Sequence, residues 1–60
     1  MSRTIPTQWT TIAYFSDCDG RFVPAPGAVC TESQAALSDD VRTRTIRVRG
    51  REELQVRRVR

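Results

Sequence analysis

The alternation of residue types in the last third of the chain constrains its fold most. Between residues 43 and 49, Ile46 and Val48 alternate with polar side chains, and a second alternating segment begins at Leu54. Strand side chains point alternately to opposite faces, and no apolar stripe with helical spacing runs through this region. The pattern therefore predicts an antiparallel hairpin over residues 43–60.

We expect the turn of this hairpin at residues 50–52. A three-residue loop there pairs Val48 with Leu54 and Ile46 with Val56, so that all four apolar side chains lie on one face. A shorter loop that places Val48 opposite an acidic residue is less favourable. The position of the glycine disfavours this three-residue loop, because the glycine comes first in it and a three-residue loop normally has its glycine last.

Arginine supplies most of the candidate binding residues on the second hairpin. In the expected register Arg47, Arg49 and Arg57 share its polar face, and Arg44 lies opposite Arg58 on the other face. Like charges directly opposite each other destabilise a strand pair, so this pair would favour an anion between its members. Arginine pairs well with both phosphates and carboxylates. The candidates on this hairpin are Arg44, Arg47, Arg49, Arg51, Arg57, Arg58 and Arg60.

Charge is distributed unevenly along the chain. Residues 1–40 hold two Arg against five acidic residues, whereas residues 41–60 hold eight Arg against two acidic residues. A basic segment attached to an acidic body indicates an acidic or polyanionic partner for the basic segment. The alternative is that these charges only keep an exposed hairpin hydrated.

Aromatic and β-branched residues predict a first hairpin over residues 8–23. We expect a three-residue loop at residues 18–20, which pairs Phe15 with Val23 and puts a glycine where the turn needs a positive φ. Both faces of the first strand carry apolar side chains, and tryptophan and tyrosine are enriched at protein interfaces. The aromatic candidates for an exposed anchor are Trp9 and Tyr14.

A short helix is expected between the two hairpins, over residues 32–38. Thr31 and Gln34 have the spacing of a capping box, in which each side chain binds a backbone N–H group of the other residue. The predicted fold class is α+β, with two antiparallel β-hairpins and one short helix. Residues 1–60 would form a single small domain, with residues 1–7 as a flexible arm. The length leaves no room for a second domain or a large enclosed active site.

Few residues could support catalysis or metal binding. The chain has no His to act as a base near neutral pH, and a Cys nucleophile would lack an activating partner. Asp17 and Asp19 lack the further oxygen ligands of a calcium loop. Cys18 and Cys30 are expected to be reduced thiols, with a disulfide or a shared metal as the alternatives. We expect no enzyme activity, no cofactor, and neither catalytic nor metal-binding residues.

These observations favour a small non-enzymatic protein-binding regulator or inhibitor. It would occupy a surface of a larger protein through its arginine-rich second hairpin and its aromatic first strand. The partner would offer an acidic surface, or a surface that normally binds nucleic acid. The small size and the arginine bias favour a phage or plasmid gene as the source of the chain.

Four alternatives stay open. The first is a nucleic-acid-binding protein that contacts the phosphates of DNA or RNA with its arginine-rich ribbon, although residues 41–60 hold no aromatic residue for base stacking. The second is a minor structural subunit of a virion or ribonucleoprotein, and the third is a redox switch. Open sheet edges would also allow a homodimer. The sequence lacks an apolar run of membrane-spanning length and a signal peptide, so we expect a cytoplasmic protein without a membrane partner.

Overall fold

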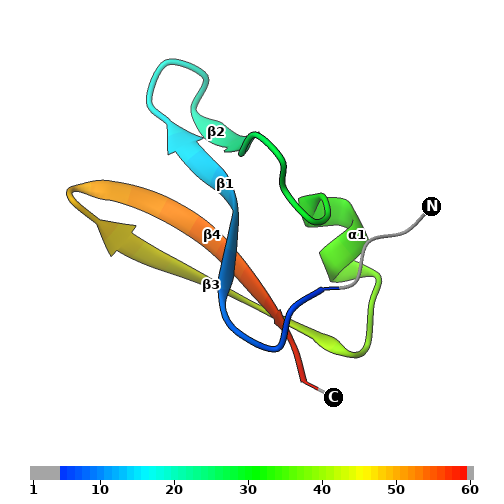
Figure 1. Cartoon of the computed structure of the whole chain (residues 1–60). Helices are drawn as coiled ribbons and strands as arrows, with labels where there is room; N and C mark the ends of the chain where they lie inside the picture. Colours follow the sequence, from blue (N-terminus) through cyan, green and yellow to red (C-terminus); the bar gives the residue numbers. More distant parts are fainter. Residues whose placement is uncertain (1–4, 60) are drawn as a thin grey trace.

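In the computed structural model, which describes residues 5–59, four antiparallel strands form one sheet and a short helix packs on one of its faces (Figure 1). The elements in chain order are β1 (Thr10–Ser16), β2 (Arg21–Pro24), α1 (Glu32–Ala36), β3 (Val41–Val48) and β4 (Arg51–Arg58). The strands lie in the order β2-β1-β4-β3, so the first and last strands are central neighbours. The fold is small and mostly β, and the expected strands and short helix are confirmed in outline.

The face of the sheet that carries α1, here called the core face, holds the hydrophobic core. The buried residues are Ile12, Ala13, Ala35, Leu54 and Val56. Partly buried side chains, among them Phe22 and Val41, pack around this cluster. Ile12 and Val56 are 1% and 0% exposed, and each buried aliphatic side chain of this size contributes roughly 1.5–3 kcal/mol. The central strands β1 and β4 supply four of the five buried residues and therefore hold the fold together.

A β-bulge in β1 changes which side chains share a face. The pairing with β4 shifts between Thr11 and Ala13, which makes Ile12 an extra residue in the strand. Both Ile12 and Ala13 are buried in the core. Because a bulge reverses the usual alternation, Trp9 before it and Tyr14 after it lie on the same face of the sheet.

The turn of the β3–β4 hairpin differs from the predicted loop at residues 50–52. It consists of two residues, Arg49 and Gly50, with φ angles of 54° and 80°. A two-residue turn with positive φ at both positions matches the right-handed twist of the flanking strands. The favourable turn geometry therefore outweighs the register that would have matched the apolar side chains.

The new register reassigns the side chains of β3. Leu54 lies opposite Thr45, and Ile46 lies opposite Glu53. The pairing is shifted by three residues from the predicted register, and a shift by an odd number of residues exchanges the two faces of a strand. Ile46 and Val48 therefore lie on the face opposite Leu54 and Val56. The predicted pairing of Val48 with Leu54 and of Ile46 with Val56 is wrong.

The β1–β2 hairpin differs by only one residue from its predicted register. Phe15 pairs with Phe22 rather than with Val23, and the loop is one residue longer than expected. The two phenylalanine rings meet edge to face, with centroids 5.5 Å apart and an interplanar angle of 79°. This contact favours the observed pairing. Gly20 has the expected positive φ, at 67°.

The capping box at the start of α1 is confirmed. The Thr31 hydroxyl accepts a hydrogen bond from the Gln34 backbone N–H at 3.1 Å, and the Gln34 side chain accepts one from the Thr31 N–H at 2.9 Å. The helix is shorter than the predicted 32–38, because Leu37 is already its C-cap.

The segment before β1 runs along the end of β4. Ile5 packs against the core cluster, and the Pro6 carbonyl accepts a hydrogen bond from the Arg58 N–H at 2.7 Å. Residues 1–4 of the predicted arm lie outside the described residues.

Candidate binding face of the sheet

The face of the sheet opposite α1 carries most of the candidate residues, and we call it the open face. Its members follow from the strand register and the β1 bulge. The ten residues that define it here are Trp9, Thr11, Tyr14, Arg42, Arg44, Ile46, Arg51, Glu53, Gln55 and Arg57. Val48 lies on the same side of the sheet near the β3–β4 turn, as do Ser16, Arg21 and Val23 near the β1–β2 turn. Among residues 5–59 the one helix packs on the other face, which leaves these side chains without a covering layer.

Two arginines contact the Trp9 ring. The Arg44 guanidinium carbon lies 4.3 Å from the ring centroid, and that of Arg57 lies 5.7 Å from it. An Arg57 nitrogen is also 3.5 Å from the Thr7 carbonyl oxygen. Contacts of a guanidinium with an aromatic ring contribute about 0.5–1 kcal/mol at exposed sites. They hold Trp9 and both arginines in one cluster.

A chain of hydrogen bonds crosses the middle of the open face. Arg44 Nε donates to Gln55 Oε1 at 2.9 Å, and Gln55 Nε2 donates to the Thr11 hydroxyl at 3.0 Å. That hydroxyl in turn donates to Glu53 Oε1 at 2.8 Å. The chain joins β3, β4 and β1, so these side chains have fixed positions relative to one another.

A second arginine–aromatic pair lies nearer the turn of the β3–β4 hairpin. The Arg51 guanidinium carbon is 4.4 Å from the centroid of the Tyr14 ring. Tyr14 is opposite Glu53, so the carboxylate lies between this pair and the Trp9 cluster. The open face therefore repeats one motif, in which a guanidinium is stacked on a half-buried aromatic ring.

The electrostatics of the open face are cationic. Its ten defining residues include four Arg and one acidic residue, Glu53. Arg42 and Arg57 lie directly opposite each other on β3 and β4, which places like charges side by side. An anion bound over this pair would relieve that repulsion. The face therefore favours a negatively charged ligand.

The structure brings together five of the nine predicted site residues: Trp9, Tyr14, Arg44, Arg51 and Arg57. The other four do not join them. Arg47 lies on the core-face side and approaches Glu52 at 3.4 Å, and Arg49 forms the turn. Arg58 lies on the core-face side opposite Val41, and Arg60 is outside the described residues. The predicted polar face of Arg47, Arg49 and Arg57 and the predicted pair of Arg44 with Arg58 are corrected by the observed register.

Five of the ten residues that define the open face are not among the predicted site residues: Thr11, Arg42, Ile46, Glu53 and Gln55. Arg42 precedes the expected hairpin by one residue, and Thr11 and Gln55 carry no charge. The hydrogen-bonding capacity of Thr11 and Gln55 was visible in the sequence, but their juxtaposition depends on the β1–β4 pairing and its bulge. No local pattern in the chain indicates that pairing.

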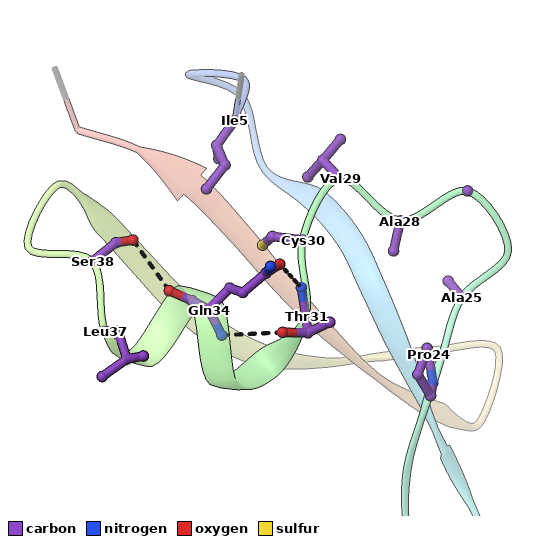
Figure 2. Close-up of a pocket in the computed structure, with 11 residues that line it drawn as sticks. Ile5, Pro24, Ala25, Ala28, Val29, Cys30, Thr31, Gln34, Leu37 and Ser38 are labelled. Carbon is purple, nitrogen blue, oxygen red and sulfur yellow. Dashed lines mark hydrogen bonds between the residues drawn. The ribbon is translucent and has the colours of Figure 1, made fainter. Parts of the chain in front are cut away.

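A separate groove of about 750 Å³ lies beside α1, on the other side of the molecule (Figure 2). Side chains from three segments surround it, among them Ile5, Val29, Cys30 and Leu37.

Burial raises the pKa of the Cys30 thiol, which keeps it protonated. Cys18 is exposed in the β1–β2 turn, and neither cysteine forms a disulfide. Within residues 5–59 no three His, Cys, Asp or Glu residues cluster as metal ligands would.

Comparison of the chain with protein-family models, with curated proteins and with solved structures gives no match. Of the segments that the structure describes, no helix has the length and apolar character needed to cross a membrane. The chain is thus defined by its own features, an antiparallel sheet with one face covered by a helix and the other lined by arginine and aromatic side chains.

Proposed function

We propose that this chain is a non-enzymatic protein-binding regulator or inhibitor that uses the open face to occupy a surface of a larger protein. The observation that carries the proposal is the clustering of Trp9, Tyr14 and four arginines on one uncovered face. Tryptophan, tyrosine and arginine are the residue types that dominate the energetics of protein interfaces.

The chemistry of the face favours an acidic partner surface. Arginine pairs with carboxylates through two parallel hydrogen bonds. Arg44 and Arg51 are already stacked on aromatic rings, so they lose little conformational freedom when a partner binds. The same preorganisation suits an inhibitor that competes for a site which normally holds nucleic acid.

A second candidate function is the binding of single-stranded nucleic acid. The observation that favours it is the interleaving of Trp9 and Tyr14 with arginines, a combination that single-strand binders use for base stacking and phosphate contact. Two features weigh against it. The rings already stack on Arg44 and Arg51, and Glu53 would face the phosphates.

The test compares two double variants with equal charge. Arg44→Gln/Arg57→Gln removes two cations from the open face, and Arg47→Gln/Arg49→Gln removes two cations outside it. Each tagged protein is used to capture partners from the cells that produce it, with and without nuclease. We expect wild type and the second variant to retain the same protein after nuclease treatment, and the first variant to lose it.

Two outcomes would contradict the proposal. Equal loss from both variants would mean that net charge rather than the open face determines capture. Loss of the captured material on nuclease treatment, together with tight and salt-dependent binding of purified protein to labelled DNA or RNA, would establish the second candidate instead.

A further inference from the structure

The two edges of the sheet differ in how well they are protected. β2 has four residues and ends at Pro24, which has no N–H group to offer another strand. β3 has eight residues and contains no proline. The turn of the β3–β4 hairpin lies at the far end of the sheet from α1 (Figure 1), and Thr43 and Thr45 are exposed although they lie on the core-face side. Within residues 5–59 no strand pairs with the outer edge of β3, which is therefore open to another strand.

The hydrogen-bonding parity of β3 identifies the free backbone groups. The Val59 N–H donates to the Asp40 carbonyl at 2.8 Å, which makes this a hydrogen-bonded pair at the end of the β3–β4 ladder. Hydrogen-bonded and non-hydrogen-bonded pairs alternate in an antiparallel ladder. The N–H and C=O groups of Thr43, Thr45 and Arg47 therefore point away from β4. These backbone groups can donate and accept the hydrogen bonds of one further strand.

The charges on β3 decide which strand fits. Arg42 and Arg44 project on the open face and Arg47 on the core-face side, and β3 has no acidic residue. A second copy of β3 would bring its own arginines against these three, so self-pairing is opposed by charge. An extended segment with carboxylates at alternate positions would meet Arg42 and Arg44 as cross-strand partners.

We infer that β3 binds an extended acidic segment of a partner protein as a fifth strand of the sheet. Backbone hydrogen bonds to Thr43, Thr45 and Arg47 supply part of the affinity, and carboxylates facing Arg42 and Arg44 supply the selectivity, as in other cases of strand addition. This inference rests on the proposed function, because it names the part of the acidic partner that the arginine face receives.

The probe is a displayed library of random 12-residue peptides, selected against the wild-type protein. We expect enrichment of peptides with Asp or Glu at alternate positions. The best peptide is then synthesised with a fluorescent label, and its affinity is measured by anisotropy. Thr45→Pro should weaken binding about tenfold or more, because it removes an outward N–H while leaving the bonds to β4 intact. Thr45→Val keeps that N–H and should bind within about twofold of wild type.

If Thr45→Pro does not fold, a backbone variant at the same position replaces it in the test. A chain of 60 residues is accessible to chemical synthesis, so the amide at Thr45 can be replaced by an ester that lacks only this N–H. Circular dichroism and the emission of Trp9 verify the fold of each variant. Arg42→Gln/Arg44→Gln should weaken the acidic peptide more than it weakens a neutral peptide of the same length.

The inference is overturned if no acidic peptides are enriched, if the ester variant binds like wild type, or if sedimentation shows that wild type is a dimer and Thr45→Pro a monomer. Its failure is distinguishable from that of the proposed function. If the partner binds on the open face but not at the β3 edge, Thr45→Pro still captures the partner protein and Arg44→Gln/Arg57→Gln does not. If the partner binds at the β3 edge but not on the open face, Trp9→Ala leaves peptide binding unchanged while Thr45→Pro weakens it about tenfold or more.

Discussion

The Arg44 guanidinium stacks on the Trp9 ring across an intervening strand. Arg44 belongs to β3 and Trp9 precedes β1, and β4 lies between these two strands. The contact therefore forms only when both hairpins have joined into one sheet. Trp9 is the only tryptophan in the chain, so its fluorescence reports on this contact directly.

Arg44→Ala should expose Trp9 and shift its emission to longer wavelength. The free energy of unfolding should fall by about 0.5–1 kcal/mol, since one ring–guanidinium contact and one hydrogen bond to Gln55 are lost. Arg47→Ala is the control, because the exposed Arg47–Glu52 pair at 3.4 Å contributes little. An unchanged emission spectrum in Arg44→Ala would show that the stacking does not persist in solution.

The free energy of unfolding should change when either residue of the β3–β4 turn is substituted. Gly50→Ala forces an alanine into φ of 80° and should cost about 1 kcal/mol. Arg49→Asn should stabilise the fold by a few tenths to about 1 kcal/mol, because Asn-Gly is the preferred pair in this turn type. Urea denaturation measures both changes, and Arg49→Gln controls for the lost charge. A neutral Gly50→Ala would mean that the turn adopts another geometry.

The same turn explains why the predicted register of the second hairpin differs by three residues from the observed one, since Val48 lies opposite Arg51 and not opposite Leu54. Pairing Ile46 and Val48 with the apolar residues of β4 favours the predicted register, whereas the position of the glycine favours a shorter loop. The structure has the shorter loop. Arg49 and Gly50 both adopt the positive φ that a two-residue turn of this type requires. The sequence signal for the turn was the glycine itself, which fits a two-residue loop better than the first position of a three-residue loop.

The candidate site was predictable in its residue types but not in its assembly. An unbroken strand would put Trp9 and Tyr14 on opposite faces, because their positions differ in parity. The bulge at Ile12 brings them together, and it buries Ile12 and Ala13 at the same time. Burial in the tertiary core thus determines which side chains of β1 lie on which face, and no local pattern in the sequence reveals the bulge. The helix start was predictable because a capping box is a purely local signal.

Thr31→Ala should lower the free energy of unfolding by about 1 kcal/mol. The substitution removes the hydroxyl that accepts from Gln34 N–H, and a helix of five residues has few other bonds to hold its first turn. Chemical denaturation measures the loss. Ser33→Ala, an exposed position in the same helix, should change stability by less than about half as much. Equal effects of the two substitutions would argue against a role for the cap.

The two cysteines should react at different rates with iodoacetamide. Cys18 is exposed, whereas burial raises the pKa of Cys30 and lowers its thiolate fraction at any given pH. Labelling followed by mass spectrometry should show Cys18 modified first, with Cys30 catching up as pH rises or when urea is added. Because the unfolded thiol ionises before the folded one, the Cys30 contribution to stability is full at neutral pH and declines through the alkaline range. Faster labelling of Cys30 would contradict its burial in the groove.

Arg58→Met should leave the free energy of unfolding unchanged or raise it by up to about 1 kcal/mol. The Arg58 Nε is buried without a hydrogen-bond partner among the described residues, and methionine keeps the apolar stem while removing that cost. Arg58→Ala should be destabilising, because it also removes the stem. Partner capture by Arg58→Met should match wild type, since Arg58 is not on the open face. A large loss of stability in Arg58→Met would reveal an interaction of the guanidinium that packing alone does not explain.

The pairing of β1 with β4 has a consequence for the timing of folding during synthesis. The β1–β2 hairpin leaves the ribosome first, but a two-stranded hairpin is marginal in water, and Ile12 is buried only once Leu54 and Val56 arrive. β1, β2 and β3 therefore remain without a core until β4 has been translated. A ribosome stalled anywhere before β4 would hold a chain with neither a core nor an assembled arginine–aromatic face, so binding competence would appear abruptly, only after β4 has been made and has left the ribosome.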